Sequence, residues 1–466
     1  MFAMLTLGSL DIAAVLLYAV VVLYIGRVAS ARGADRGAEE FLLAGRGLGL
    51  PLFVASLVST WYGGILGIGE IAYRDGVVTL LTQGGFWYIA YLLFALLLAG
   101  RIRRSEQTTL PDEIGRMHGE TARVIASALN FLNVVPIAYL LSLGLLAQIV
   151  TGWPLWLCVG LGGAVATAYS LLGGFRAVLY TDMLQFALMC LAVALLMGRS
   201  VTALGGAEYL ATRLPAGHLA PSGRIGAQEM FVWLVVALST LVDPNFYHRC
   251  HAARDERTAR RGVLLAIGFW MLFDVCTTFT SVYARAALPG IDARVALPAL
   301  AQHLLPGGLK GLFFVGLLAT VMSTVDSYCF VAGMSVGHDL YRRRLKPDAT
   351  DAQVVRATRF GVAASAALAV ALSLYFRGSF KAIWKTLGSL SSAAVLVPML
   401  LGFAGFRPRG GGAAAMLGGT VGTLGWSALR RFGPPWAMKL EPLLPGLALS
   451  LLGFTAAALL ARGKRA

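Results

Sequence analysis

The segment "LLATVMSTVDSYCF" (residues 317–330) places hydroxyl side chains inside one of the most apolar runs of the chain. Thr320, Ser323, Thr324 and Ser327 are spaced at i, i+3, i+4 and i+7, which is one stripe of an α-helix. A single hydroxyl in such a helix commonly bonds to its own or a neighbouring helix. Four on one stripe, with Asp326 among them, favour a bound ligand. Oxygen ligands with few carboxylates suit a monovalent cation such as Na⁺ better than Ca²⁺.

Acidic side chains form a second set of candidates, because Glu70, Asp182, Asp274 and Asp326 lie within or beside apolar runs. An ionisable residue inside a membrane is costly and is functional by default. Asp182 and Asp326 are therefore expected to be neutral or to pair with an arginine. Asp274 either contacts a substrate or is a hydrogen-bonded structural acid. Glu70 lies near enough to a span end to reach interfacial water.

The composition indicates an integral membrane protein. Of the 466 residues, 58% are hydrophobic and 13% charged, and the mean hydropathy is +0.73, whereas soluble proteins have about 25% charged residues. The net charge of +16 lies in short loops between apolar runs, which is typical of membrane orientation and contact with anionic lipid rather than of nucleic-acid binding. We expect one all-α membrane domain over residues 1–466, with neither a nucleic-acid partner nor an obligatory protein partner.

About thirteen membrane spans are predicted from apolar runs of about 18–28 residues. They are 8–27, 49–73, 78–99, 122–148, 153–172, 177–199, 229–248, 262–287, 310–337, 358–376, 383–405, 412–430 and 441–461. An odd number puts the two termini on opposite sides. The loops richest in Lys and Arg (101–107, 249–261 and 341–346) then share one side. The positive-inside rule predicts an outside N-terminus and a cytoplasmic C-terminus in the cell (inner or plasma) membrane.

Two of these spans are interrupted. Span 49–73 carries Gly63, Gly64, Gly67 and Gly69, and span 229–248 carries "LVDPNFY". Non-helical backbone at membrane depth is tolerated where it is buried in protein or lines a cavity. The interrupted spans open two five-span blocks of opposite predicted topology, 49–199 and 229–405, which is typical of transporters built from inverted repeats. Residues 8–27 and 406–466 are predicted to be peripheral.

Four motifs, in order along residues 11–405, resemble the sodium:solute symporters, a family that carries proline, glucose, pantothenate and sialic acid. They are "EEFLLAGRGLGLPLFVASLVSTWYGG", "GGFRAVLYTDMLQ", "DPNFYHRCHAARDERTARRG" and "GLLATVMSTVDSYCF". The resemblance implies a LeuT-type fold of five plus five inverted core helices. It also implies sodium-coupled import of a small organic solute by alternating access.

The resemblance also implies which residues bind. The main sodium site would use the hydroxyls of Ser323 and Thr324 and the carbonyls of Thr320, Leu57 and Thr60. A second site, present in some members, would use Asp182, Asp326, Ser327 and Ser323. Because two carboxylates in one site repel, Asp182 and Asp326 could hold a second Na⁺, line its exit route or be coupled to H⁺.

The solute is expected between the two interrupted spans. Its candidate contacts are Trp61, Tyr62, Gln83, Asn245, Phe246 and Asp274. Gln83 aligns with a sugar contact of sugar-carrying relatives, but their other polar contacts are not evident, so a sugar carrier is not predicted. No arginine near the membrane midplane is evident for a carboxylate substrate, which could instead meet the positive half-helix end near Thr60–Gly64.

Three other functions compete with sodium symport. A proton-coupled transporter of the same fold and a transporter-like sensor signalling through a partner are alternatives. An enzyme would need a nucleophile–base pair or a metal cluster. The six histidines lie in or beside loops without ligand spacing, and His248 and His251 are expected on a solvated basic segment. We therefore expect no catalytic site.

Overall fold

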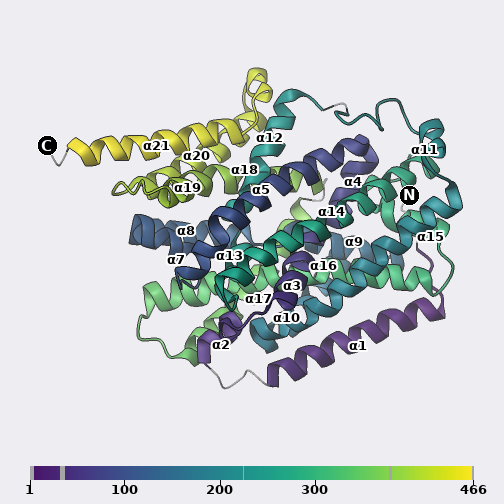
Figure 1. Cartoon of the computed structure of the whole chain (residues 1–466), viewed down its shortest axis with the longest axis horizontal. Coiled ribbons are helices and arrows are strands. Elements are labelled where there is room, and N and C mark those ends of the chain that lie inside the picture. Colours follow the sequence, from purple (N-terminus) through teal and green to yellow (C-terminus); the bar gives the residue numbers. More distant parts are fainter. Residues whose placement is uncertain (1–4, 32–36, 224, 377–379, 464–466) are drawn as a thin grey trace.

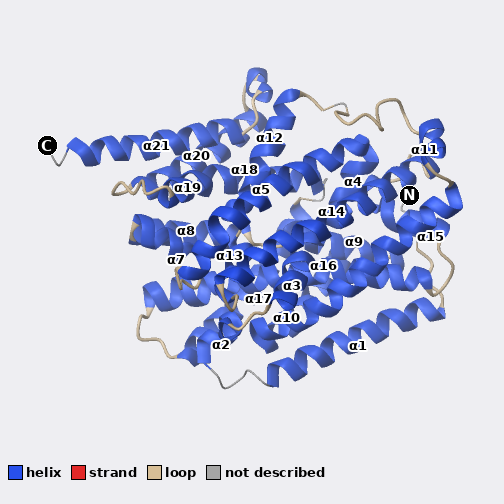
Figure 2. Cartoon of the chain, in the orientation of Figure 1, coloured by secondary structure: helices blue, strands red, loops and turns tan. Residues whose placement is uncertain are grey.

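The computed structural model describes residues 5–31, 37–223, 225–376 and 380–463, in which all regular elements are helices (Figure 2). Eleven helical segments within these residues are long and apolar enough to cross a membrane. The chain is therefore an all-α multi-pass membrane protein. Of the thirteen predicted spans, 153–172 corresponds to a shorter apolar stretch, Leu155–Ala168. Span 412–430 is the helix Gly411–Phe432, which is not among the eleven.

The helices follow one another with mostly short connections, apart from the longer one between Arg213 and Ala227. The first ten are α1 (Ser9–Ala31), α2 (Gly37–Leu43), α3 (Leu50–Trp61), α4 (Ile65–Asp75), α5 (Phe86–Leu93), α6 (Gly100–Arg104), α7 (Leu110–His118), α8 (Glu120–Asn133), α9 (Ile137–Thr151) and α10 (Leu155–Leu204). The remainder are α11 (Ala207–Arg213), α12 (Ala227–Ala237), α13 (Pro244–Ala252), α14 (Glu256–Ala287), α15 (Ala296–Leu304), α16 (Leu309–Met334), α17 (Asp351–Tyr375), α18 (Phe380–Ser391), α19 (Val397–Phe403), α20 (Gly411–Phe432) and α21 (Leu443–Gly463).

The hydroxyl-bearing helix α16 lies at the centre of the bundle. It continues into a π-helical segment, η8 (Ser335–Leu345), and 94% of its most apolar stretch is buried, against 22% for α1 and 22% for α21. Figure 1 shows α1 along one edge and α20 with α21 along another. The assignment of residues 8–27 and 406–466 as peripheral and the division of the core into two inverted repeats both stay predictions.

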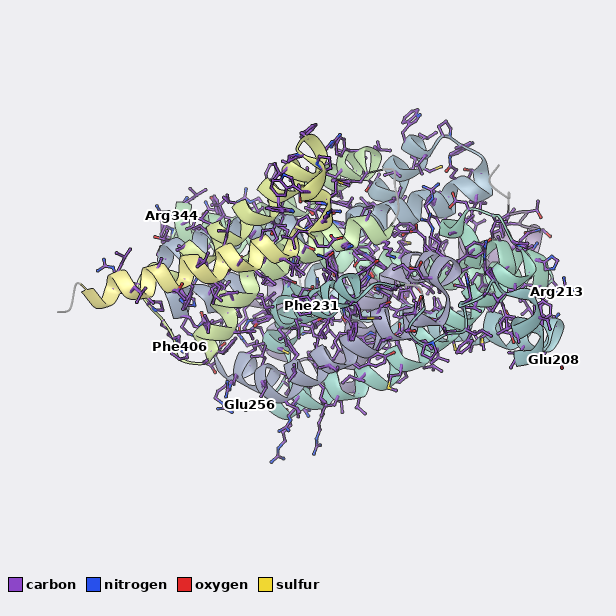
Figure 3. All side chains as sticks on the ribbon, turned by 90° about the horizontal axis from the view of Figure 1, so that it is seen from above. Glu208, Arg213, Phe231, Glu256, Arg344 and Phe406 are labelled. Carbon is purple, nitrogen blue, oxygen red and sulfur yellow. The ribbon has the colours of Figure 1, made fainter. Side chains whose placement is uncertain are left out.

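The last described helix, α21, runs to the left of the molecule, whereas α11 and α15 lie at its right (Figure 1). Figure 3 places Glu256 and Arg344 toward one end of the molecule and Glu208 and Arg213 toward the other. The loops predicted to face the cytoplasm therefore lie together, away from the loop between α10 and α12.

Both predicted helix interruptions are present. The 3₁₀ turn η2 (Tyr62–Gly64) separates α3 from α4. The second break follows the 3₁₀ turn η6 (Leu238–Val242), where Asp243 is extended (φ −81°, ψ 121°) and Pro244 begins α13. The Asp243 side chain accepts hydrogen bonds from the first free N–H groups of α13, which is the usual role of an N-cap aspartate.

The start of α3 and the end of α13 are joined by backbone pairing, which we call the end latch (residues 46–48 and 252–254). The Leu48 N–H donates to the carbonyl of Ala252 at 3.0 Å, and the Arg254 N–H donates to the carbonyl of Leu48 at 3.0 Å. Arg46 has a left-handed φ of +52°. Its guanidinium donates to three carbonyls, those of Glu106 (3.1 Å), Gln107 (3.2 Å) and His251 (3.3 Å). The latch closes one end of the two broken helices against each other.

A glycine break divides α10 into the two predicted spans. Gly174 has φ +61° and ψ −172°, a conformation essentially restricted to glycine. A Cβ there would lie 2.7 Å from Phe41 Cδ2. The second glycine of "GGFRAVLYTDMLQ" therefore permits both the bend and the approach of α2.

We predict that Gly174→Ala lowers the free energy of unfolding by about 1–3 kcal/mol, because alanine must adopt a glycine conformation against Phe41. Thermal unfolding of the purified protein in detergent measures this loss. The matched control is Gly198→Ala, also in α10, where an added Cβ meets nothing within 4 Å. Equal melting temperatures for the two variants would contradict the predicted strain.

Candidate functional site

The hydroxyls of α16 face the break between α3 and α4. Ser323 Oγ donates to the carbonyls of Ser59 (3.1 Å) and Thr320 (3.0 Å). Thr324 Oγ1 lies 2.8 Å from the carbonyl of Thr60, 3.2 Å from that of Thr320 and 3.4 Å from that of Ser59. Two hydroxyls and three carbonyls from two chain segments therefore form one buried cluster, in which each hydroxyl lies within 3.4 Å of two or three of the carbonyls. A set of hydroxyls and carbonyls without a carboxylate suits a monovalent cation.

One of these carbonyls differs from the predicted set, which paired Thr60 with Leu57. The Tyr62 N–H donates to the carbonyl of Val58 at the end of α3, so the carbonyl of Leu57 lies inside the regular helix. The carbonyls of Ser59 and Thr60 come after it, where the backbone tightens into η2. The structure therefore brings together Thr320, Ser323 and Thr324 with Ser59 and Thr60.

Gly63 allows α16 to approach this break. A Cβ at Gly63 would lie 2.0 Å from Thr324 Oγ1 and 2.4 Å from Thr324 Cβ, distances at which atoms overlap. The glycine in "STWYGG" therefore brings the Thr324 side chain directly against the backbone of η2.

Behind these oxygens lies a buried cation, Arg249, which has no exposed surface. Its Nη2 donates to Thr60 Oγ1 (2.5 Å) and Ser327 Oγ (2.7 Å) and lies 3.7 Å from Asp182 Oδ2. Its Nε donates to Ser56 Oγ (3.2 Å), and that hydroxyl donates to Asp182 Oδ2 at 2.6 Å. One guanidinium from α13 thus links α3, α10 and α16.

Arg249 stands among the residues predicted for a second ion site. Asp182 and Ser327 are both in contact with it. Asp326 is also completely buried in α16. Ser323 belongs to the five-oxygen cluster instead.

The basic segment after the second break was predicted incorrectly. Arg249 was assigned to a cytoplasmic loop, and His248 and His251 to a solvated face, but all three are buried. The helix does not end at residue 248 but runs to Ala252 within the core. His248 Nε2 lies 2.7 Å from the carbonyl of Leu42. A signal was present in the sequence, because Arg249 falls only six residues after Asp243 and so within the first two turns of the new helix.

A cavity of about 150 Å³ lies beside the first break. Four of the predicted solute contacts line it: Trp61, Tyr62, Gln83 and Asp274. The Nε2 atom of Gln83 is buried without a hydrogen-bond partner in the protein, which leaves a donor for a solute or water. The other two predicted contacts lie behind the wall. Asn245 Oδ1 accepts from Arg249 (3.4 Å), and Phe246 packs edge-on against Trp61 (5.1 Å).

Glu70 has a structural role in place of the expected contact with interfacial water. It is completely buried, and its Oε2 accepts a hydrogen bond from the N–H of Phe380 (2.8 Å) at the start of α18. Arg74 Nη2 lies 3.2 Å from its Oε1. Glu70 therefore ties α4 to α18.

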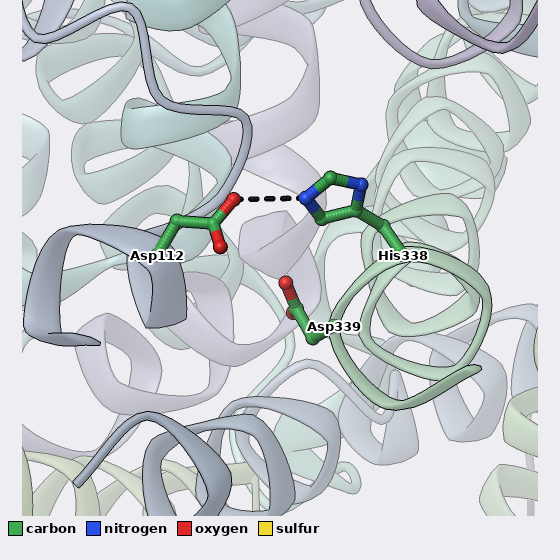
Figure 4. Close-up of side chains that lie close together, drawn as sticks. All are labelled: Asp112, His338 and Asp339. Carbon is green, nitrogen blue, oxygen red and sulfur yellow. Dashed lines mark hydrogen bonds and ion pairs between the residues drawn. The ribbon is translucent and has the colours of Figure 1, made fainter. Parts of the chain in front are cut away.

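Asp112, His338 and Asp339 form a compact group of possible metal ligands (Figure 4). Asp112 Oδ2 lies 2.8 Å from His338 Nε2, and Thr109 donates to Asp339 Oδ1 at 2.5 Å. The other Asp112 oxygen faces two guanidinium groups, those of Arg343 (3.3 Å) and Arg123 (3.5 Å). Two cations on the same carboxylate make this group an ion-pair network that fastens α7 and α8 to η8.

Comparisons with known proteins agree with these features. A model of the sodium:solute symporter family matches residues 41–422. An osmoregulated proline transporter of Bacillus subtilis is 27% identical, with 94% of this chain and 92% of the relative covered. A high-affinity choline transporter of Caenorhabditis elegans is 23% identical, with 89% and 76% covered. A Na⁺-coupled sialic acid symporter, solved in a substrate-bound outward-open state, superposes with a TM-score of 0.79 at 16% identity over 98% of each chain. That likeness shows the fold, which is LeuT-type.

We predict that Arg249→Met costs about 3–5 kcal/mol of unfolding free energy, because it leaves Asp182 as a buried charge without its cation. Adding Asp182→Asn removes that charge, so the double variant should be more stable than Arg249→Met alone. Thermal unfolding in detergent measures both. Arg199→Met, at an exposed position of α10, is the control and should change stability by less than about 0.5 kcal/mol. A double variant no more stable than Arg249→Met would contradict the pairing.

We predict a second stability loss for Asp112→Asn. Burial raises the pKa of Asp112, but His338 and the two arginines outweigh burial and lower the pKa. The ionised carboxylate therefore stabilises the fold above its ordinary pKa of roughly 3.9, and this stabilisation is lost as the pH falls below that value. The melting-temperature difference between wild type and Asp112→Asn should be full at neutral pH and shrink in acid. Asp348→Asn, at an exposed aspartate, should show no such difference, and a pH-independent difference would rule out the mechanism.

Proposed function

The chain belongs to the sodium:solute symporter family, and from this premise we propose that it imports a small organic solute together with Na⁺. Members of the family couple solute movement to sodium, and the fold supports alternating access. The observation that carries the assignment is the five-oxygen cluster of Ser59, Thr60, Thr320, Ser323 and Thr324. We propose that this cluster binds the coupling ion.

Sodium bound there would join the two parts that must move. Two of its ligands are carbonyls at the end of α3, and three are in α16. In the structure the hydroxyls of Ser323 and Thr324 donate to those carbonyls, so binding would turn the hydroxyl oxygens toward the ion. Holding η2 against α16 would favour one of the alternating states, and release of Na⁺ into a sodium-poor cytoplasm would free the pair.

The coupling to solute follows from the order of residues along the break. Ser59 and Thr60 offer carbonyls to the ion, and the next two residues, Trp61 and Tyr62, line the cavity. Ordering the backbone at residues 59–60 therefore also orders the wall at residues 61–62. By reciprocity each ligand must raise the affinity of the other by the same factor, typically equivalent to 1–3 kcal/mol.

We further propose that one sodium ion is moved per cycle. The second predicted site, at Asp182 and Ser327, is in contact with the guanidinium of Arg249. The guanidinium of Arg249, which cannot leave the protein, takes the place of an exchangeable Na⁺ or H⁺. It balances the negative charge of Asp182 throughout the transport cycle. The orientation proposed is the one predicted from loop charges, with the N-terminus outside and the C-terminus in the cytoplasm.

We predict that Ser323→Ala with Thr324→Ala abolishes stabilisation by Na⁺. Sodium at about 100 times its Kd should stabilise the wild type by about 2.7 kcal/mol, and the stabilisation should follow a one-site curve. Thermal shift in Na⁺ against K⁺ measures it without knowledge of the solute. Thr202→Ala with Thr455→Ala, two exposed hydroxyls bonded to their own helices, is the control. Sodium stabilisation that survives in the Ser323/Thr324 variant would refute the assignment, and a two-site curve would refute the single ion.

A further inference from the structure

Aromatic rings form more than a third of the lining of the cavity beside the first break, eight of 22 residues. Five of the nine tryptophans of the chain line it, together with three tyrosines. The tryptophans are Trp61, Trp87, Trp233, Trp270 and Trp384. Trp61, Trp87 and Trp384 are half-buried, so they keep exposed ring surface. The volume of about 150 Å³ is below the roughly 300–1,000 Å³ of pockets for drug-sized ligands and suits a small solute.

The aromatic walls meet at angles. The rings of Trp87 and Trp233 are 6.0 Å apart and inclined by 49°, and those of Tyr139 and Tyr328 are 5.0 Å apart and inclined by 67°. Rings inclined in this way are not stacked face to face, so the ring that presents its edge keeps its π faces free of the other ring. A π face attracts cations, tryptophan most strongly, and several faces together recognise alkylated ammonium groups.

The charged side chains that line the cavity are both acidic, Asp243 and Asp274. Among the described lining residues there is no lysine, arginine or histidine. Two carboxylates without a basic partner in the same cavity would repel an anionic solute and attract a cation.

The hydrogen bonds given to these carboxylates come from neutral groups. Asp274 Oδ2 accepts from the hydroxyl of Tyr88 at 2.6 Å. Asp243 Oδ1 accepts from the N–H groups of Asn245 (2.8 Å) and Phe246 (3.3 Å). Arg249, from the same helix as these two amides, is bonded to Thr60 and Ser327 instead and does not line the cavity. Arg249 lies close enough to Asp243 to act on its charge. Asp274 is hydrogen-bonded by a neutral hydroxyl, which orients the carboxylate but leaves its charge to be balanced by a ligand.

We propose that the transported solute is a small organic cation with an alkylated ammonium group, held against the aromatic walls and balanced by Asp274. This inference rests on the proposed transport function and specifies its substrate class. Asp274 has the central part, because it lines the cavity from α14, next to Tyr62, whose hydroxyl donates to Thr277 of the same helix.

The test measures how three compounds of matched shape stabilise the purified protein in Na⁺. The control without Na⁺ contains K⁺, because organic cations that commonly replace Na⁺ are themselves candidate ligands. Choline carries the quaternary ammonium group. Its uncharged isostere 3,3-dimethylbutan-1-ol keeps the shape without the charge, and glycine betaine adds a carboxylate. Choline should stabilise the protein at a concentration at least tenfold lower than either of the others and should be taken up into proteoliposomes with Na⁺. Equal or tighter binding of the isostere or of betaine, or no binding of choline, would overturn the proposal.

Two variants test the role of the acid. Asp274→Asn should weaken choline binding at least tenfold and leave the Na⁺-induced thermal shift in place, which also verifies folding. Asp274→Glu should recover part of the affinity, because it restores the charge. Unchanged choline affinity in Asp274→Asn would overturn the assignment. Failure of this inference is distinguishable from failure of the proposed function. A protein that is stabilised by Na⁺ but not by choline would contradict the substrate class and leave sodium coupling standing. A protein that does not respond to Na⁺ would contradict both proposals.

Discussion

A guanidinium without exposed surface must exchange its hydration for contacts with protein groups, because an unpaired buried charge costs several kcal/mol. Arg249 makes that exchange with Thr60, Ser327 and Asp182, which belong to three different helices. These helices are α3, which ends at the first break, α16, which carries the hydroxyl stripe, and α10. The relative positions of the two candidate sites therefore depend on one side chain contributed by the second broken helix.

This arrangement divides the polar groups of the core by charge. The five-oxygen cluster holds no carboxylate, Asp182 is balanced by an arginine, and the two acids of the cavity face aromatic rings. Under the two proposals each cation has its own environment: carbonyls and hydroxyls for the proposed Na⁺, a carboxylate and hydroxyls for Arg249, and π faces with Asp274 for the proposed solute. Separate environments keep a small hard ion and a large soft cation from competing for one site.

Much of this could be predicted from the sequence. The span pattern, both helix breaks and the hydroxyl stripe follow from local periodicity and from Gly and Pro, which act through the backbone of their own segment. The buried position of Arg249 could not be predicted from the sequence. A basic run after an apolar span ordinarily marks a loop, and only tertiary packing places α13 in the core. That the carbonyl of Ser59, rather than that of Leu57, contacts Ser323 depends on where the helical ladder ends, and such boundaries shift by a residue or two. The network of Asp112 with His338 joins residues more than two hundred positions apart, which no local pattern reveals.

The end latch bears on how fast the protein can work. Separating α3 from α13 at the latch requires the two backbone hydrogen bonds of Leu48 and the three hydrogen bonds of Arg46 to break together. All five bonds hold the segment before α3 against α13 and against residues 106–107. Bonds that break in concert contribute a barrier with a large enthalpy, whereas diffusion of a small solute through a cavity does not. Turnover limited by this step would rise steeply with temperature and would respond little to solute concentration once the cavity is filled.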